Sequence, residues 1–506
     1  MPQSLFPPLD HRSSGVLAHL SSLPSDFGIG TLGKEARLFI DFLASSGFSY
    51  WQMCPIGPTG FGDSPYQSFS TFAGNPYFID FSELIKYELL EDPDLIPLKE
   101  LSKTKTDYGA LHLLHEPILK KAFLEFQKHP KKFPFHPEQA LFLKNNQNWL
   151  IPYSTFRAFK KYFNELPFWE WDAGYKTYEN TKKTPLYKEL QQEIEFHKFI
   201  QFLFFHQWNS LHDYAKSKNI KLIGDIPIFI AHDSADFWAN SGLFKLDAKN
   251  NPDQVAGVPP DYFSELGQLW GNPLYNWNKA RSKCFKWWTE RIKHHLKLFD
   301  VLRLDHFRGF ESYWSIPANA PDARTGKWLK GPGISFFKHL AKELPQAHLI
   351  AEDLGIITKD VIALRDKTGL PGMAVLQFAF DNNPKNAFLP HNLTKNLVAY
   401  SGTHDNDTTK GWFEKLPPAG KDQVRRYFRI SGNDIAWDFI HILYATTCDL
   451  VIITMQDLLN KGSEARLNFP GTSQGNWQWR FTIEEFESLQ KNSSLYLQEI
   501  KWLYDR

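Results

Sequence analysis

Acidic side chains end four short apolar segments of this chain. The segments read IKLIGDIPIFI, VLRLDHF, LIAEDLG and LVAYSGTHD, and their acids include Asp225, Asp305, Glu352 and Asp405. A single acid at the end of a strand is more often a helix N-cap or half of a salt bridge than a catalytic group. Several acids at the same end of different strands are much less easily a coincidence. The four residues together therefore predict one acidic site.

Arg303, two positions before Asp305, gives these carboxylates different roles. The two side chains share one face of a strand, because alternate strand residues point the same way. A guanidinium beside a carboxylate favours its ionised form, which a nucleophile requires. Glu352 is expected among other acids, and neighbouring negative charge raises a carboxyl pKa. A raised pKa suits a general acid that must keep its proton near neutral pH.

This pair of carboxyl groups predicts retaining glycoside chemistry. That chemistry needs one ionised and one protonated carboxyl group, about 5 to 5.5 Å apart. Asp405 would support the positive charge that develops on the sugar ring, and His306 and His404 would bind hydroxyl groups. Metal binding is the competing interpretation, because Asp, Glu and His on barrel strands also bind metal ions. Arg303 argues against a metal, since a cation beside a metal ion is unfavourable. We expect neither a metal nor a cofactor.

Eight short apolar segments, alternating with helical patterns, must position these residues. Segments that are apolar on both faces suit parallel strands buried beneath helices. Eight of them favour a closed (β/α)8 barrel over an open doubly wound sheet, although the pattern alone leaves both open. The chain has no GxGxxG or P-loop motif that would favour a nucleotide-binding sheet. The strands are expected at 15–24, 50–58, 220–230, 301–307, 349–355, 373–380, 397–403 and 450–454.

Two long interruptions divide the barrel pattern. Residues 1–83 contain the first two β/α units, 84–190 are expected to form a mainly helical insertion subdomain, and 191–506 contain the rest of the barrel. Residues 233–280 are rich in Gly, Pro, Asn and aromatic residues, and so long a loop over a barrel mouth is usually functional. We expect it to cover the substrate. Helices are expected near 108–127, 138–163 and 187–216, with a further one from about 34 that stops near Gly47.

The charge balance and the cysteines limit the class of protein. Lysine and arginine number 57 against 56 acidic residues, a net charge of +1, which gives no electrostatic case for nucleic acid or an anionic membrane surface. No apolar run reaches the roughly 18 residues that span a bilayer, and no signal peptide is expected at the start. The three cysteines are far apart in the sequence and predict reduced thiols. We expect a cytoplasmic protein with an uncharged partner.

Several segments resemble a known family. Four segments are similar to the four signature regions of the α-amylase clan, and their particular residues resemble those of the amylomaltases, or 4-α-glucanotransferases. These segments are GDIPIFI, VLRLDHFRGF, IAEDLG and GTHDNDT. FGDSPYQSFSTFAGNPYFID, AGVPPDYFSELGQLWGNPLYNW and NFPGTSQGNWQWR resemble that family more specifically. The resemblance covers nearly the whole barrel and is weakest over about 84–190.

The resemblance implies a role for individual residues. Asp305 matches the nucleophile of the family, Glu352 its acid/base and Asp405 its transition-state stabiliser. The implied reaction is retaining transfer of α-1,4-glucan segments between glucans, with maltooligosaccharides as substrates and glucose as acceptor or product. The candidate substrate-binding residues are Arg303, His404, Asp225, His306, Ser64, Tyr66, Gln67, Trp270, Asn272 and Asn476.

The carboxylates do not indicate whether the acceptor is a sugar or water. The main alternative is therefore an α-1,4-glucan hydrolase of amylase type. Aromatic loops around Tyr66, Tyr262 and Trp270 favour transfer, because they would bind an acceptor and exclude water. The short segment after the last strand favours it too, since amylases carry a C-terminal β-sandwich. A non-catalytic glucan-binding protein would not need all three carboxylates. Phe61 departs from a tyrosine that some members carry at a second glucan groove, and it keeps a stacking face without the hydroxyl.

Overall fold

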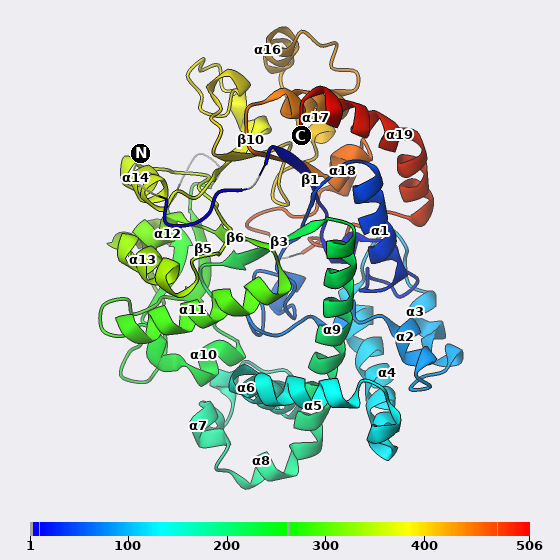
Figure 1. Ribbon diagram of the computed structural model, residues 1–506. Coiled ribbons are helices and arrows are strands. Elements are labelled where there is room, and N and C mark those ends of the chain that lie inside the picture. Colours follow the sequence, from blue (N-terminus) through cyan, green and yellow to red (C-terminus); the bar gives the residue numbers. More distant parts are fainter. Residues whose placement is uncertain (1–3, 10, 261–263, 473) are drawn as a thin grey trace.

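A parallel sheet of eight strands forms the centre of the computed structural model, which describes residues 4–9, 11–260, 264–472 and 474–506 (Figure 1). Its order is β10-β11-β12-β1-β2-β3-β6-β9, which is chain order read around a ring. The strands are β1 (Ser13–Leu17), β2 (Tyr50–Gln52), β3 (Lys221–Pro227), β6 (Val301–Asp305), β9 (Leu349–Ala351), β10 (Gly372–Val375), β11 (Leu397–Tyr400) and β12 (Leu450–Thr454).

The two end strands of this order, β9 and β10, approach each other and nearly close the ring. The Ala351 N–H donates to the carbonyl of Pro371, just before β10, at 2.9 Å. One carboxylate oxygen of Asp353 accepts the Met373 N–H at 2.8 Å, and the other binds Arg365 at 2.6 Å. The expected (β/α)8 barrel is therefore confirmed, and Asp353 is a structural residue of its seam.

Alternation along the strands separates two cores. Because successive strand residues point to opposite faces, one set fills the barrel and the other packs beneath the helices. The inner set is a separate cluster that includes Leu17, Tyr50, Ile223, Val301, Ile350, Met373, Val398, Tyr400 and Ile452. The outer set, with Val16, Trp51, Leu222, Leu302, Ala351, Ala374, Ala399 and Val451, belongs to the main hydrophobic core.

Helices surround the sheet, and none of the described ones is long and apolar enough to cross a membrane. The predicted stop near Gly47 is confirmed, because α1 ends at Ser45 and Gly47 has a φ of 81°, which favours glycine. The helices of the wall and its C-terminal part are α1 (Lys34–Ser45), α9 (Gln191–Ser217), α10 (Ala235–Ala239), α11 (Arg281–Leu298), α12 (Arg308–Glu311), α13 (Ile334–Glu343), α14 (Lys359–Thr368), α15 (Thr409–Lys415), α16 (Pro418–Phe428), α17 (Ile435–Ala445), α18 (Met455–Leu458) and α19 (Ile483–Leu503).

A helical segment lies between β2 and α9, and α5 to α8 gather at the lower end of Figure 1. The helical structure expected near 138–163 is present as two helices, because the first ends at Asn145 and the second begins at Gln147. Between them, Asn146 has a φ of −114° and a ψ of 9°, outside the helical region, and its side chain accepts from the Trp149 indole at 3.0 Å and donates to the Phe142 carbonyl at 2.9 Å. The helices are α2 (Phe81–Lys86), α3 (Ile96–Lys99), α4 (Tyr108–Lys128), α5 (His136–Asn145), α6 (Gln147–Tyr162), α7 (Tyr178–Thr181) and α8 (Pro185–Glu189).

A second, antiparallel sheet occupies part of the expected covering loop. Its order is β5-β4-β7-β8. The strands are β4 (Gln254–Val258), β5 (Gln268–Pro273), β7 (Ser312–Pro317) and β8 (Lys327–Lys330). Sequence reasoning missed this sheet because half of it comes from the chain after β6, beyond the 233–280 segment. Strand β10 is also shorter than expected, since a 3₁₀ turn begins at Leu376.

Candidate active site

Arg303 of β6 is the centre of a buried charge cluster at the barrel mouth. Its Nη1 lies 2.5 Å from Asp225 Oδ2 and 3.0 Å from Asp305 Oδ1. Arg303 and Asp225 are buried, whereas the Asp305 side chain is 26% exposed. Burial raises the pKa of Asp225 to about 6, and Arg303 opposes this rise. One guanidinium therefore positions two carboxylates from neighbouring strands and leaves the Asp305 side chain partly exposed.

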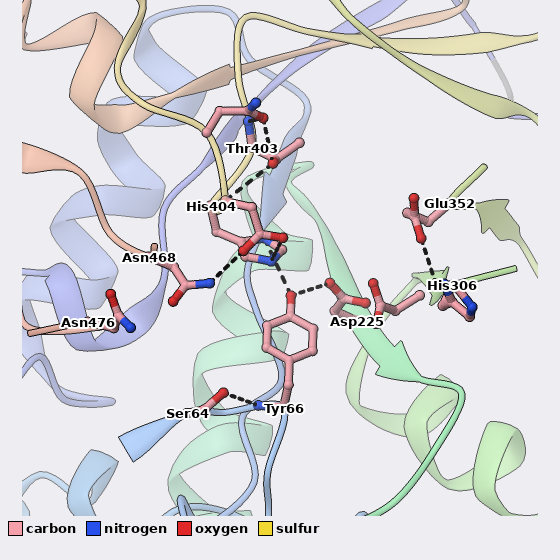
Figure 2. A network of polar contacts seen from close by, with 12 residues as sticks. Ser64, Tyr66, Asp225, His306, Glu352, Thr403, His404, Asn468 and Asn476 are labelled. Carbon is pink, nitrogen blue, oxygen red and sulfur yellow. Dashed lines mark hydrogen bonds and ion pairs between the residues drawn. The ribbon is translucent and has the colours of Figure 1, made fainter. Parts of the chain in front are cut away.

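Tyr66 connects this cluster to the end of β11 (Figure 2). Its hydroxyl donates to Asp225 Oδ2 at 2.8 Å and lies 3.4 Å from His404 Nδ1. The phenol ring also stacks on the His404 imidazole, with centroids 5.0 Å apart and planes 23° apart. Tyr66 is thus fixed by contacts to two strand ends, although it comes from the loop after β2.

Glu352 follows β9 and is almost fully enclosed. Its Oε2 accepts the backbone N–H of His306 at 2.7 Å, and its Oε1 accepts that of Leu354 at 2.8 Å. Burial raises its pKa to about 7, Arg303 opposes the rise, and Asp305 adds to it. The expected neighbouring charge is present, but the larger cause is burial, so the predicted explanation was wrong in its emphasis. The carboxyl can keep a proton near neutral pH.

The partners of Asp405 are the side chains of His404 and Asn468, whereas those of Glu352 are backbone N–H groups. His404 Nε2 lies 3.2 Å from its Oδ2, and Asn468 donates to its Oδ1 at 2.6 Å. Burial pushes the pKa of Asp405 upward, but His404 and Asn468 outweigh that effect and lower it to about 2. The side chain also stays 45% exposed, which limits the cost of its charge. Asp405 is therefore ionised.

Asn468 is a site residue that sequence reasoning missed. It lies in the loop after β12, and Arg466 supports it by donating to the carbonyls of Asn468 at 2.9 Å and Asp405 at 2.7 Å. The available indication was its place at the start of the NFPGTSQGNWQWR segment. Asn476 of the same segment accepts from Phe469 N–H at 2.9 Å and donates to Thr472 at 3.0 Å. Its amide therefore braces the loop that carries Asn468.

The remaining predicted residues line the mouth on two sides. Gln67 donates to Asn272 at 3.2 Å, and Asn272 donates to the Ile230 carbonyl at 2.8 Å. The Ser64 hydroxyl accepts the backbone N–H of Tyr66 at 3.2 Å. These contacts join the loop after β2 to strand β5 of the antiparallel sheet.

His306 contacts Trp270, which belongs to the same strand β5 as Asn272. The indole and imidazole meet edge to face with centroids 4.9 Å apart. His306 has a φ of 53°, a left-handed conformation that directs its N–H to Glu352. Burial lowers its pKa to about 4, and its Nε2 finds no hydrogen-bond partner among the described residues. A neutral imidazole with a free nitrogen suits a sugar hydroxyl.

In the part of the chain that the structure describes, no group of three or more His, Cys, Asp or Glu residues could bind a metal ion. Tyr262 and the side chain of Phe61 fall outside the described residues, so both predictions about them stay open.

A (β/α)8 barrel with ionised and protonated carboxyl groups at its C-terminal mouth defines the class of barrel enzymes that act on glycosidic bonds. A family model described as 4-alpha-glucanotransferase matches residues 18–485. The chain therefore belongs to the 4-alpha-glucanotransferase family.

Relatives cover nearly the whole chain. The 4-alpha-glucanotransferase of Thermus thermophilus is 45% identical over 93% of this chain and 94% of its own length. That of Clostridium butyricum is 43% identical over 94% and 99%, respectively. The solved amylomaltase of Streptococcus agalactiae, in complex with acarbose, superposes with a TM-score of 0.93 at 39% identity, covering 98% of this chain and 99% of its own. The predicted family and fold are confirmed.

Proposed function

We propose that Asp305, Glu352 and Asp405 transfer α-1,4-glucan segments from a donor to an acceptor glucan through a covalent glucosyl–enzyme intermediate. The observation that carries this assignment is the contrast at the barrel mouth. Glu352 has a pKa of about 7, while Asp305 is ion-paired with Arg303 and Asp405 has a pKa of about 2. Retaining chemistry needs this division between one protonated and one ionised carboxyl group.

In the first step, the Asp305 carboxylate attacks the anomeric carbon of the donor. Glu352 gives its proton to the departing glycosidic oxygen, so the reducing-end fragment leaves as a neutral alcohol. The ionised Asp405 stabilises the positive charge that develops on the sugar ring. Arg303, fixed between Asp225 and Asp305, keeps the nucleophile oriented.

In the second step, Glu352 is a carboxylate and acts as the base. It takes the proton of the 4-hydroxyl of an acceptor glucan, whose oxygen attacks the anomeric carbon and releases Asp305. Two inversions at this carbon give net retention, and the proton returns to Glu352. The same step with glucose as the acceptor lengthens glucose by the transferred segment.

Transfer requires a sugar to react before water does. The loops that line the mouth supply aromatic and amide groups at Tyr66, Trp270, Gln67 and Asn272, which suit a sugar acceptor. The related Streptococcus agalactiae amylomaltase is solved in complex with acarbose, which supports saccharide binding by this chain. We infer a cytoplasmic enzyme, since its three cysteines are buried free thiols of the kind that reducing compartments favour.

Incubation with maltotriose tests the acceptor. Transfer predicts glucose together with a ladder of longer maltooligosaccharides, at constant reducing-end concentration. Only shorter products with rising reducing ends would instead identify the hydrolase. The Asp305→Asn variant should lose turnover while keeping glucan binding, and binding without turnover in the unmodified protein would identify a glucan-binding protein.

A further inference from the structure

The loop after β2 carries Ser64, Tyr66 and Gln67, and it is built as a short hairpin over residues 58–69. Phe69 N–H donates to the Pro58 carbonyl at 3.1 Å, and Gly60 N–H donates to that of Gln67 at 2.9 Å. Phe69 is at the base of the hairpin, and its carbonyl accepts the N–H of Ala235, at the start of α10, at 2.8 Å. The position of the base therefore determines where the tip presents its side chains.

Two cations of α6 cover the Phe69 ring. The Arg157 guanidinium lies 4.9 Å from the ring centroid, and the Lys160 ammonium lies 5.1 Å from it. The ring of Phe156, from the same helix, lies 6.3 Å away. Cation–π contacts that are withdrawn from water are stronger than exposed ones, and Lys160 is only 2% exposed. The helical segment between β2 and α9 thus contacts the site through this ring.

Lys160 also binds the loop that follows β3. Its ammonium lies 2.5 Å from Asp233 Oδ2 and donates to the carbonyls of Glu165 at 3.1 Å and Leu166 at 3.2 Å. All three of its N–H donors are therefore used, which is what a buried lysine requires. Next to Asp233, the His232 ring stacks on Trp169 of the helical segment, with centroids 4.2 Å apart.

We propose that Lys160 is a positioning residue for the side of the active site that the 58–69 hairpin forms. It fixes α6, the 58–69 hairpin and the β3–α10 loop to one another, and through the hairpin it fixes Tyr66 over Asp225. This role rests on the proposed function and gives the helical segment a part in it. Lys160 does not touch the reacting atoms, so its removal should weaken glucan binding and leave the chemical step intact.

Kinetics with maltotriose test this proposal. Lys160→Met removes the ammonium, and Phe69→Leu removes the ring but keeps the Lys160–Asp233 pair, so the second variant tests the contact if the first folds poorly. Both should raise KM by about tenfold and leave kcat within about twofold, since small misplacements of binding groups cost affinity. Lys161→Met is the matched control, because Lys161 is 47% exposed and pairs with Glu116 and Glu193 instead.

The outcomes distinguish the positioning role of Lys160 from a merely structural one. A fall in kcat at unchanged KM, matched by a lower melting temperature, would overturn the proposal, as would unchanged kinetics in both variants. A KM that rises equally in Lys161→Met would overturn it too. Absence of transfer in the unmodified protein would contradict the proposed function. Normal transfer with an unchanged KM in the variants would contradict only the positioning role of Lys160.

Discussion

Glu352 and Asp405, at the ends of β9 and β11, each accept two hydrogen bonds but have opposite pKa shifts. Glu352 is 9% exposed, and both of its donors are neutral backbone N–H groups. The side chain of Asp405 is 45% exposed, and one of its two partners is His404. Burial lowers the pKa of His404, but the charge of Asp405 and the hydrogen bond to it raise this pKa by more. The net shift is upward, which favours the protonated imidazole.

This comparison shows that the number of hydrogen bonds does not decide which carboxyl keeps its proton. The partner side chain decides it here. Burial raises the pKa of both carboxyl groups, and only Asp405 has an imidazole in direct contact, whose attraction helps to outweigh that rise. The barrel supplies both environments within one mouth. Mutations that change the environment of Glu352 or Asp405 should therefore change which of the two carboxyl groups is protonated, and with it the activity.

The largest effect is expected from Glu352→Gln, which removes the proton donor. Its kcat on maltotriose should fall by about 10²- to 10⁴-fold, the usual contribution of a general acid. Fluoride leaves without a proton, so the variant should still release fluoride from α-maltosyl fluoride in a burst. Equal losses with both donors would show that Glu352 does not protonate the leaving group.

A smaller effect is expected from Asn468→Asp, which gives Asp405 a like-charged partner. The pKa of Asp405 should rise, and because this residue must be ionised, activity should be lost at a higher pH as the pH falls. The measurement is the acid limb of the kcat/KM profile. Asn468→Ala removes the donor without adding charge and should shift the limb less, in the same direction. Three superimposable profiles would contradict the proposed role of Asn468.

The smallest effect concerns stability. The pKa of Glu352 is about 7 in the folded chain against 4.5 as its ordinary value. Between these values the folded state binds a proton that the unfolded state has lost, so the free energy of unfolding falls as the pH rises. Glutamine does not titrate. Glu352→Gln should therefore melt above the unmodified protein at pH 8, with a difference that shrinks toward pH 5. A difference that is constant with pH would contradict the raised pKa.

The strand-end residues could be predicted because a barrel places the ends of all its strands at one mouth. Arg303 and Asp305 share a face by the period of a strand, and this held in the structure. Neighbouring Asp353 shows the limit of that reasoning, since the same kind of acid turned to Arg365 and the barrel seam. The two acids are adjacent in the sequence, but the side chain of Asp353 points to Arg365 and that of Glu352 points to the backbone of His306.

Loop residues could not be predicted in the same way. Asn468 reaches Asp405 from a loop after β12, and no periodicity indicates where such a loop returns. The antiparallel sheet was missed because β4 pairs with β7, a strand beyond β6 in the sequence. Burial as the main cause of the Glu352 shift also depends on packing, which becomes visible only in the folded chain.

Trapping the covalent intermediate tests the division of roles most directly. In Glu352→Gln, α-maltosyl fluoride should form the glycosyl–enzyme, and no base then remains to activate an acceptor. Mass spectrometry of the digested protein should find one added maltosyl group on the peptide that contains Asp305, and none when Asp305→Asn is added. A maltosyl group on any other residue, or fluoride release without an adduct, would contradict the assignment of Asp305 as the nucleophile.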